Sequence, residues 1–479
     1  MNQNDQIQIQ RDISRSIRKT PPPYKDLMPF FLDKKLWESA WRKVQQADGA
    51  NTPGIDGETC HGIASRVHQW LGSLHHQVSH GKYVPQKVLE IAIPKSSGSG
   101  SRTIGILTIK DRVVQTVLKL VLEPIFESRF HQSSFGFRPG RSVAAALNAV
   151  CSTMAEGQSN ELTYPYAVHL DVANCFPTID HTVLLRQFSL LVADAELTTF
   201  LQRILDAGAS KTGFLNRRSI GLVQGSALSP LLCNFYLHGI DEAMAVFCKN
   251  HFWNLQMYRY ADDILLIGKA PQILEQGIRQ IKQLLKERHQ KLGNYNPISN
   301  VQNCNWLGVQ FQTYSNPWNQ TVSFGYILKE DKVKKMISEI NDMTMPPSER
   351  IDSATFDLGQ WIVSINRRLS EWYDTIVFAK NATEIFETLD NHISERVGYL
   401  FKSVLKIRKK ELFQKYRIRL PRGFSTWEIN GNRLKVLSSL PPKRPVGLVH
   451  SPSWEQNKKK TTHLPISKTS LITIGRKAK

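Results

Sequence analysis

The stretch Arg259-Tyr260-Ala261-Asp262-Asp263 decides the fold, because it places two adjacent carboxylates between two apolar runs. The runs 256–260 and 264–267 have the length of β-strands, and the three residues between them predict a tight hairpin. A hairpin buried in a core normally excludes charged side chains. The two acids are therefore either turn residues exposed to solvent or parts of a site that needs their charge, and this stretch alone leaves both interpretations open.

A third acid, Asp171, ends a second predicted strand over residues 166–171. Phosphoryl transfer by two divalent ions needs carboxylates that converge on cations about 3.5–4 Å apart, one activating the attacking 3′ oxygen and the other neutralising the leaving pyrophosphate. Asp171 at a strand end and Asp262 in a hairpin would supply that convergence, with Asp262 as the second bridging ligand. Asp263 can take part only if the turn bends the two neighbouring acids together, because successive strand residues point opposite ways.

We therefore predict that Asp171, Asp262 and Asp263 are catalytic, and that the same acids together with Val172 bind metal. Mg²⁺ suits this work because it prefers hard oxygen ligands and keeps waters and substrate phosphates in its shell. Mg²⁺ is thus the expected cofactor, with Mn²⁺ as the alternative ion.

The composition bounds the class of protein. A length of 479 residues predicts about three domains at roughly 150 residues each. The formal net charge of +21 favours a polyanionic partner, and a hydrophobic content of 41% excludes a wholly disordered chain. The charge is uneven, because residues 401–479 carry a net +17 and the first 400 residues only +4. We expect a near-neutral body followed by a basic C-terminal part.

Several classes of protein are excluded. The six cysteines are scattered and none forms a Cys-x-x-Cys pair, which excludes a disulfide framework and a zinc site of that type. Residues 1–16 contain no apolar core and cannot be a signal peptide. The charge-free stretch 219–240 carries polar residues such as Gln224 and Asn234, so we reject it as a membrane helix. We expect a cytoplasmic protein that binds no membrane.

Local patterns divide the chain into segments. Residues 1–23 are polar and end in three prolines, and we expect them to form a flexible arm. Apolar residues at helical spacing predict helices over 34–47 and 111–130, and another that begins at Leu228. Two apolar runs around a soft loop predict a hairpin over 88–109.

A long apolar stripe over residues 358–377 contains several aromatic residues. At helical spacing such a stripe is typical of the buried face of a helix bundle. The alternative is that these aromatic rings stack on nucleic-acid bases.

Taken together, these patterns resemble reverse transcriptases of the group II intron type over about residues 35–450. The family's motifs occur in its order; besides Tyr-Ala-Asp-Asp they are Gly54-Ile55-Asp56-Gly57, Ile93-Pro94-Lys95 followed by Arg102 and Asp111-Arg112-Val113-Val114-Gln115, Ser134-Phe135-Gly136-Phe137-Arg138-Pro139-Gly140-Arg141-Ser142, and Gln224-Gly225-Ser226-Ala227-Leu228-Ser229-Pro230. The resemblance implies an α+β right-hand polymerase fold, with fingers, a palm built on an antiparallel sheet, and a helical thumb. The implied segments are a flexible arm at 1–33, fingers at 34–160, a palm with the catalytic site at 161–325, a maturase-like thumb at 326–450 and a basic tail at 451–479.

The resemblance also implies nucleotide-binding roles. Lys95 and Arg102 resemble the cations that clamp the incoming triphosphate, and ordinary surface charge is their alternative role. Phe176 resembles the steric gate that rejects a ribose 2′-hydroxyl, or else it packs in the core. Gln224 resembles the residue that lines the sugar pocket, or else it is only a turn residue.

Contacts to template and primer are implied as well. Arg138 and Arg141 resemble residues that contact template phosphates, with structural salt bridges as the alternative. The run Asn305-Trp306-Leu307-Gly308-Val309 resembles the primer grip. Template or primer contacts are therefore expected at Trp306, Leu307, Gly308 and Tyr260.

The chain departs from the family pattern near residues 296–301. The family usually carries a lysine there that protonates the leaving pyrophosphate, whereas this stretch contains no cation and the spacing of Lys291 is wrong. No Cys/His-rich cluster follows the basic tail, so target cleavage by this chain is not expected.

The sequence therefore predicts an RNA-directed DNA polymerase that adds dNTPs to a primer 3′ end while bound to a structured RNA. The expected partners are an intron or another non-coding RNA, an RNA template, a DNA or RNA primer, and dNTPs. Two alternatives stay open: an RNA-binding splicing maturase with weak or vestigial polymerase activity, or a domesticated reverse transcriptase in anti-phage defence. The oligomeric state and the mode of priming are not determined by these patterns.

Overall fold

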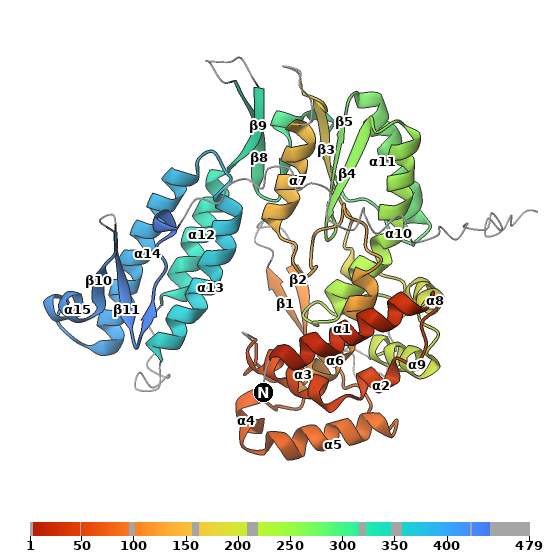
Figure 1. Cartoon of the computed structure of the whole chain (residues 1–479), viewed down its shortest axis with the longest axis horizontal. Helices are drawn as coiled ribbons and strands as arrows, with labels where there is room; N and C mark the ends of the chain where they lie inside the picture. Colours follow the sequence, from red (N-terminus) through yellow and green to blue (C-terminus); the bar gives the residue numbers. More distant parts are fainter. Residues whose placement is uncertain are drawn as a thin grey trace, which may run out of the picture.

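The computed structural model describes residues 3–47, 49–94, 101–155, 162–207, 219–315, 322–345, 357–421 and 424–440. A four-stranded antiparallel sheet in the order β4-β5-β3-β6 lies in the body of the molecule (Figure 1). Its strands are β3 (Tyr166–Asp171), β4 (Leu255–Tyr260), β5 (Asp263–Gly268) and the short β6 (Ser299–Asn300). The three strands predicted around the acids are confirmed. The hairpin turn is one residue shorter than expected, because Tyr260 pairs with Asp263 and leaves only Ala261 and Asp262 in the turn.

Both faces of this sheet are buried. Helices α10 (Ser229–Asn250) and α11 (Pro271–Lys286) pack against the face that contains Leu266. Helix α7 (Val143–Ala155) packs against the opposite face, which contains Leu265. Since successive residues of a strand alternate between faces, two-sided burial makes β5 a continuous apolar run.

Helix α10 covers most of the charge-free stretch that could have been mistaken for a membrane span. Across the described parts of the chain, no helix is long and apolar enough to cross a bilayer. The prediction of a helix beginning near Leu228 is confirmed.

The N-terminal part adds helices and one hairpin. The helices predicted over 34–47 and 111–130 are confirmed as α3 (Lys34–Gln45) and α6 (Ile109–Glu127), and the predicted hairpin is confirmed as β1 (Leu89–Pro94) paired antiparallel with β2 (Ser101–Ile106). Helix α6 begins where it does because the Thr108 hydroxyl accepts a hydrogen bond from the Asp111 amide. This part also contains α2 (Met28–Phe31), α4 (Cys60–Ile63) and α5 (Val67–Ser79), and two further helices, α8 (His181–Leu191) and α9 (Ala195–Leu205), follow β3.

The flexible arm predicted for the N-terminus is wrong. Residues Gln3–Lys19 form helix α1, which packs on α3 and α6. Ile9, Ile13 and Ile17 recur every fourth residue, so they lie on one face of the helix and are buried. This apolar stripe is only one residue wide. The composition of the segment is therefore mostly polar and does not indicate a buried helix.

Substituting Ile13→Ala should lower the free energy of unfolding by about 2–5 kcal/mol, because the side chain is 0% exposed and its removal leaves a cavity between α1 and α6. Ile7 lies on the same helix but is 43% exposed. Ile7→Ala should change the stability by less than about 0.5 kcal/mol. Urea denaturation of both variants measures the difference, and equal stabilities would mean that α1 is not docked.

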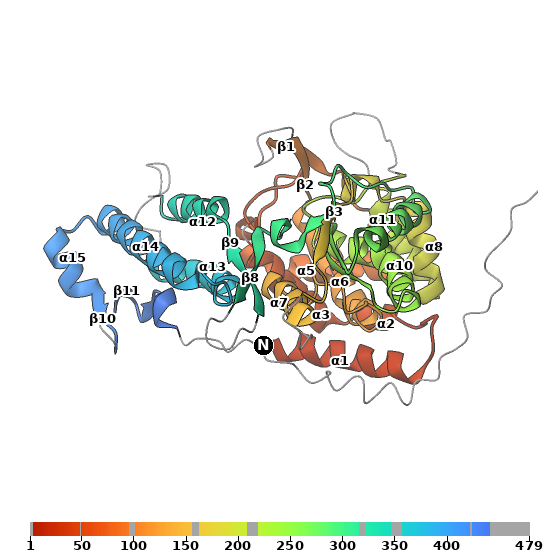
Figure 2. The ribbon, with the colours of Figure 1, turned by 90° about the horizontal axis from the view of Figure 1, so that it is seen from above.

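A helical lobe follows the body (Figures 1 and 2). It contains α12 (Glu330–Met343), α13 (Leu358–Ile376), α14 (Ala382–Leu405) and α15 (Lys409–Tyr416), with a small sheet of β10 (Arg417–Arg419), β11 (Ser425–Ile429) and β12 (Asn432–Arg433) that the sequence did not predict. A second antiparallel sheet of β7 (Asn305–Trp306), β8 (Val309–Ser315) and β9 (Val322–Leu328) links this lobe to α7. Buried residues of α7, β8 and α13 belong to one hydrophobic cluster, so the lobe and the sheet share a core. The apolar stripe of α13 is a buried bundle face, as predicted.

Candidate active site

A cleft of about 1190 Å³ lies between the end of β3 and the β1–β2 hairpin. Asp171 and Val172 line it from β3, and Asp262 lines it from the β4–β5 turn. The other walls come from the loop after β3, the loop before α10 and strand β2. They are formed by residues 174–178, 220–226 and 103–105, with Phe137.

The structure brings two of the three predicted acids into this cleft. Asp171 lies directly opposite Asp263 in the antiparallel pairing of β3 and β5, and the Val172 amide donates a hydrogen bond to the Asp262 carbonyl (3.3 Å). Asp263, however, does not line the cleft. Its carboxylate lies 2.9 Å from the Nε2 atom of His169, two residues before Asp171 on the same strand face. Asp263 therefore shares a sheet face with its cross-strand partner Asp171, while its carboxylate contacts His169.

The electrostatics of Asp262 suit a cation ligand. Burial raises the pKa of its carboxyl, and the adjacent Asp263 carboxylate raises it further. The ionised form that binds metal is thus costly without a counter-charge, which a divalent cation would supply.

The oxygen donors in the cleft fit magnesium. Mg²⁺ is typically held by one or two carboxylates together with waters and substrate phosphates. Asp171 and Asp262 provide two carboxylates at an open cleft, and Val172, which also lines it, has a backbone carbonyl as a further oxygen donor. Within the described ranges, no group of three or more His, Cys, Asp or Glu side chains forms a closed metal cage. The arrangement favours an ion shared between protein and substrate.

The hairpin turn is packed tightly against the segment 133–136. The Arg259 amide donates to the Ser133 carbonyl (2.7 Å), and the Phe135 amide donates to the Arg259 carbonyl (2.8 Å). A Cβ atom at Gly136 would lie 2.4 Å from the Ala261 nitrogen. Gly136 is therefore needed for the close approach of the two backbones.

Two of the four predicted nucleotide-binding side chains lie at the cleft. Phe176 begins the 3₁₀ turn Phe176–Thr178, is half-buried, and its ring meets Phe137 edge-to-face at 6.3 Å between centroids. Gln224 lines the same cleft, and its carbonyl accepts a hydrogen bond from the Gly105 amide (2.7 Å). Lys95 lies outside the described residues. Only the backbone of Arg102 is described, in β2 opposite Ile93.

Arg138 makes the salt bridge that was the alternative to its predicted phosphate contact. Its guanidinium donates to the Glu127 carboxylate (3.0–3.1 Å) and to the carbonyls of His131 and Ser134 (both 2.7 Å), and the residue is buried. These contacts use the Arg138 guanidinium inside the loop and favour the structural role. Arg141 also supports this loop, since it donates to the Gln132 carbonyl (2.8 Å) and lies over the Phe135 ring.

The four residues predicted to contact template or primer lie in different surroundings. The Trp306 side chain is 1% exposed and packs in the core shared with the lobe, which favours a structural role over a direct template or primer contact. Leu307 and Gly308 form the left-handed turn between β7 and β8. Lys332 of α12 lies against Gly308, and burial lowers the pKa of its ammonium group. Tyr260 is half-buried against the same core.

The sequence alone did not point to two further residues at the hairpin: His169, which contacts Asp263, and Arg259, which contacts the turn. His169 could have been found, because it shares a strand face with Asp171. Arg259 is fully buried and bonds to the Ala261 carbonyl beneath the turn. The feature that could have revealed Arg259 in the sequence is its charge inside an otherwise apolar strand.

Comparison with known proteins assigns the family. The family model described as reverse transcriptase (RNA-dependent DNA polymerase) matches residues 93–311, which contain every residue that lines the cleft except Glu90. The chain is also 30% identical to protein YkfC of Escherichia coli over 268 residues, which is 50% of this chain and 70% of that protein. The chain belongs to the reverse transcriptase family. This assignment confirms the predicted right-hand polymerase fold and the predicted RNA-directed DNA polymerase activity.

Other relatives refine the assignment to the group II intron type. The chain is 30% identical to the group II intron-encoded protein LtrA of Lactococcus lactis, over 45% of this chain and 34% of that protein. Nuclear intron maturase 2 of Arabidopsis thaliana is 56% identical over 41 residues, 9% of this chain and 6% of the maturase. The chain thus spans about a third of the length of the intron-encoded relative. Enzymes of this family generally use divalent metal ions and bind nucleic acid.

Proposed function

We propose that this reverse transcriptase extends a primer 3′ end with dNTPs through Mg²⁺ ions held by Asp171 and Asp262, with Mn²⁺ as a substitute. The observation that carries this proposal is that these two acids, 91 positions apart in the sequence, line one open cleft. When bound, the ions would activate the primer 3′ oxygen and neutralise the leaving pyrophosphate. In this proposal Asp263 acts indirectly, through its contact with His169.

The chain's own residues would orient the nucleotide. The cleft volume of about 1190 Å³ exceeds the roughly 300–1,000 Å³ of an ordinary small-molecule pocket, which leaves room for a nucleotide and a primer end. Phe176, in the 3₁₀ turn after β3, and Gln224, in the loop before α10, both line the cleft that contains Asp171. Lys95 and Arg102, which flank the soft loop 96–101 in the sequence, are proposed to bind the triphosphate.

Primer extension on poly(rA)/oligo(dT) tests the proposal. Wild-type protein should extend the primer when Mg²⁺ and dTTP are present, and the double variant Asp262→Ala, Asp263→Ala should not. Circular dichroism and template–primer binding should be unchanged in the variant, which separates lost chemistry from lost folding. Extension that survives the double substitution would refute the proposed site.

Phe176→Ala should reduce the preference for dNTPs over rNTPs by about 10- to 200-fold, the range expected when a pocket loses one apolar contact surface. The ring of Phe176 would otherwise occupy the space that a 2′-hydroxyl needs. The ratio of kcat/KM for dTTP and UTP measures the effect. An unchanged ratio, with a lowered melting temperature, would assign Phe176 to core packing alone.

We also propose that the protein works with a structured RNA. The net charge of +21 and the helical lobe of α12–α15 beside the sheet support such a partner. The RNA would be an intron if the protein also acts as a splicing maturase, and a short non-coding RNA if it serves anti-phage defence. Sequencing the RNA that co-purifies with the protein separates an intron lariat from a short non-coding RNA.

A further inference from the structure

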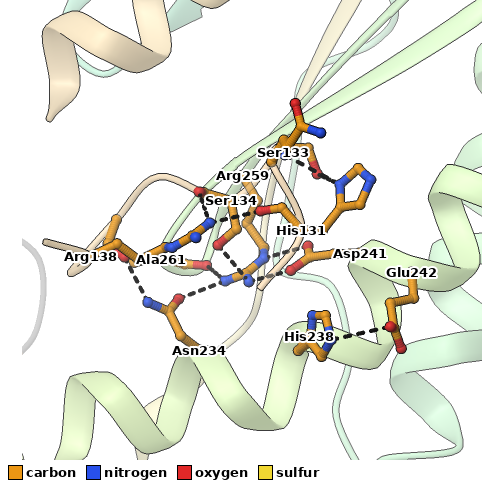
Figure 3. A network of polar contacts seen from close by, with 12 residues as sticks. His131, Ser133, Ser134, Arg138, Asn234, His238, Asp241, Glu242, Arg259 and Ala261 are labelled. Atoms are coloured by element: carbon orange, nitrogen blue, oxygen red, sulfur yellow. Dashed lines mark hydrogen bonds and ion pairs between the residues drawn. The ribbon is translucent and has the colours of Figure 1, made fainter. Parts of the chain in front are cut away.

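A fully buried ion pair lies directly beneath the catalytic turn (Figure 3). Arg259 of β4 and Asp241 of α10 both have side chains with no exposed surface. The Arg259 Nε atom donates to Asp241 Oδ1 (2.7 Å), and Nη2 donates to Asp241 Oδ2 (2.5 Å). The pair is thus bidentate, which fixes the plane of the guanidinium.

The remaining donors of Arg259 reach three further acceptors. Nη2 donates to the Ser134 hydroxyl (2.8 Å), and Nη1 donates to the Asn234 side-chain oxygen (2.9 Å) and to the Ala261 carbonyl (2.8 Å). A guanidinium has five N–H groups, and all five are used. Figure 3 shows these acceptors converging on Arg259 from the α10 helix, the Ser134 segment and the turn.

Stability alone is a weak explanation for this pair. Taking two charges out of water is costly, and apolar residues of similar volume often replace such a pair without loss of stability. Position 259 lies in an apolar strand between Tyr258 and Tyr260, where a neutral side chain would fit the pattern. An apolar residue could make none of the bonds to Ser134, Asn234 and the Ala261 carbonyl, and of these only the bond to Ala261 acts on the turn.

That bond acts on the peptide that precedes Asp262. Ala261 has a φ of +59°, a left-handed conformation that costs energy in a residue with a Cβ atom. The Ala261 carbonyl and the Asp262 nitrogen belong to one planar peptide, so fixing the direction of the carbonyl also fixes the start of Asp262. The guanidinium of Arg259, which is itself held rigidly, therefore fixes the strained turn through its hydrogen bond to the Ala261 carbonyl.

We propose that Arg259 is a positioning residue that, anchored by Asp241, holds the Ala261–Asp262 peptide and thereby sets the metal-binding geometry of the Asp262 carboxylate. This inference rests on the proposed metal-binding role of Asp262. It assigns the buried pair to the reaction rather than to the stability of the sheet.

The test compares two variants of the full chain. The double variant Arg259→Met, Asp241→Leu removes the donor to Ala261 without leaving a lone buried charge. Ser134→Ala is the matched control, because it removes another partner of the same guanidinium that does not belong to the turn. Unfolding midpoints and template–primer Kd are measured for both, together with kcat, the Mg²⁺ concentration for half-maximal rate, and Mn²⁺ affinity by electron paramagnetic resonance.

The double variant should fold and bind template–primer within about threefold of wild type, with Mn²⁺ affinity and kcat each lowered about 10- to 100-fold, as for the loss of a residue that orients a metal ligand. Ser134→Ala should stay within about threefold in both quantities. A folded double variant with wild-type Mn²⁺ affinity and kcat would overturn the inference.

A substitute variant covers the case in which the double variant does not fold, and a separate result distinguishes failure of this inference from failure of the proposed function. If the double variant does not fold, Arg259→Lys takes its place, because a lysine can pair with Asp241 but cannot reach Ala261, Asn234 and Ser134 together. Wild-type Mn²⁺ affinity in folded Arg259→Lys would likewise overturn the inference. Primer extension that survives Asp262→Ala would instead refute the proposed function, and this result is independent of Arg259.

Discussion

Asp262→Asn is expected to lower kcat for primer extension by about 10³-fold, whereas Asp263→Asn should lower it by no more than about tenfold. A catalytic metal ion contributes several kcal/mol to the stabilisation of the transition state, and each 1.4 kcal/mol or so is a factor of ten in rate. Asp262 lines the cleft and would lose its charge on substitution. Asp263 contacts His169 outside the cleft, and an asparagine oxygen can still accept that hydrogen bond.

Single-turnover extension with saturating dTTP measures both rates, and circular dichroism confirms that both variants fold. His169→Gln provides a further comparison, because it removes the imidazole that contacts Asp263 without altering either cleft acid. Equal losses in the two asparagine variants would show that both neighbouring acids bind metal, and that the turn rearranges when substrate enters.

Gly136→Ala is expected to destabilise the protein by about 1–3 kcal/mol and to lower kcat by about 100-fold. The added Cβ atom would lie 2.4 Å from the Ala261 nitrogen, 3.0 Å from the Tyr260 carbonyl carbon and 3.1 Å from the Ala261 Cα atom. All three are backbone atoms, so no flexible side chain can move aside. Overpacking of this kind forces a backbone shift. A shift of about 1 Å at a catalytic group costs about 100-fold in rate.

Gly140→Ala is the matched control in the same loop. Unlike Gly136, Gly140 has a positive φ, and a Cβ atom there would have nothing within 4 Å. Its substitution should therefore cost stability through backbone strain while leaving kcat near wild type. If both glycine variants lost activity equally, the loop as a whole, and not its contact with the turn, would be responsible.

The strands and acids could be predicted because their signals are local. A short alternating run that ends in Asp171, and two apolar runs around Asp262, define the hairpin and its neighbour without any tertiary information. Helix α1 could not be recognised from composition, because three isoleucines carry its buried face. The two-residue turn was missed because pairing register depends on hydrogen bonds between strands, which the sequence does not reveal.

The site residues that could be predicted are likewise those whose signal is local in the sequence. Asp171 and Asp262 were found because an acid in an apolar setting is unusual. Arg138 and Trp306 were assigned to nucleic acid by resemblance, and only tertiary packing reveals that Glu127 and the shared core take up their side chains. Arg259 was missed for a related reason, since its partner Asp241 lies on a helix 18 positions earlier.

Two-sided burial of the central sheet limits how the length of this chain can change. A one-residue insertion or deletion between 255 and 268 would exchange the two faces of β4 or β5, moving apolar side chains from one core to the other and carrying Asp262 away from Asp171. Such length changes should therefore be absent from active variants obtained by random mutagenesis. Loops at the molecular surface are where insertions should accumulate, and libraries that alter nucleotide or template preference should vary length there while keeping the hairpin fixed.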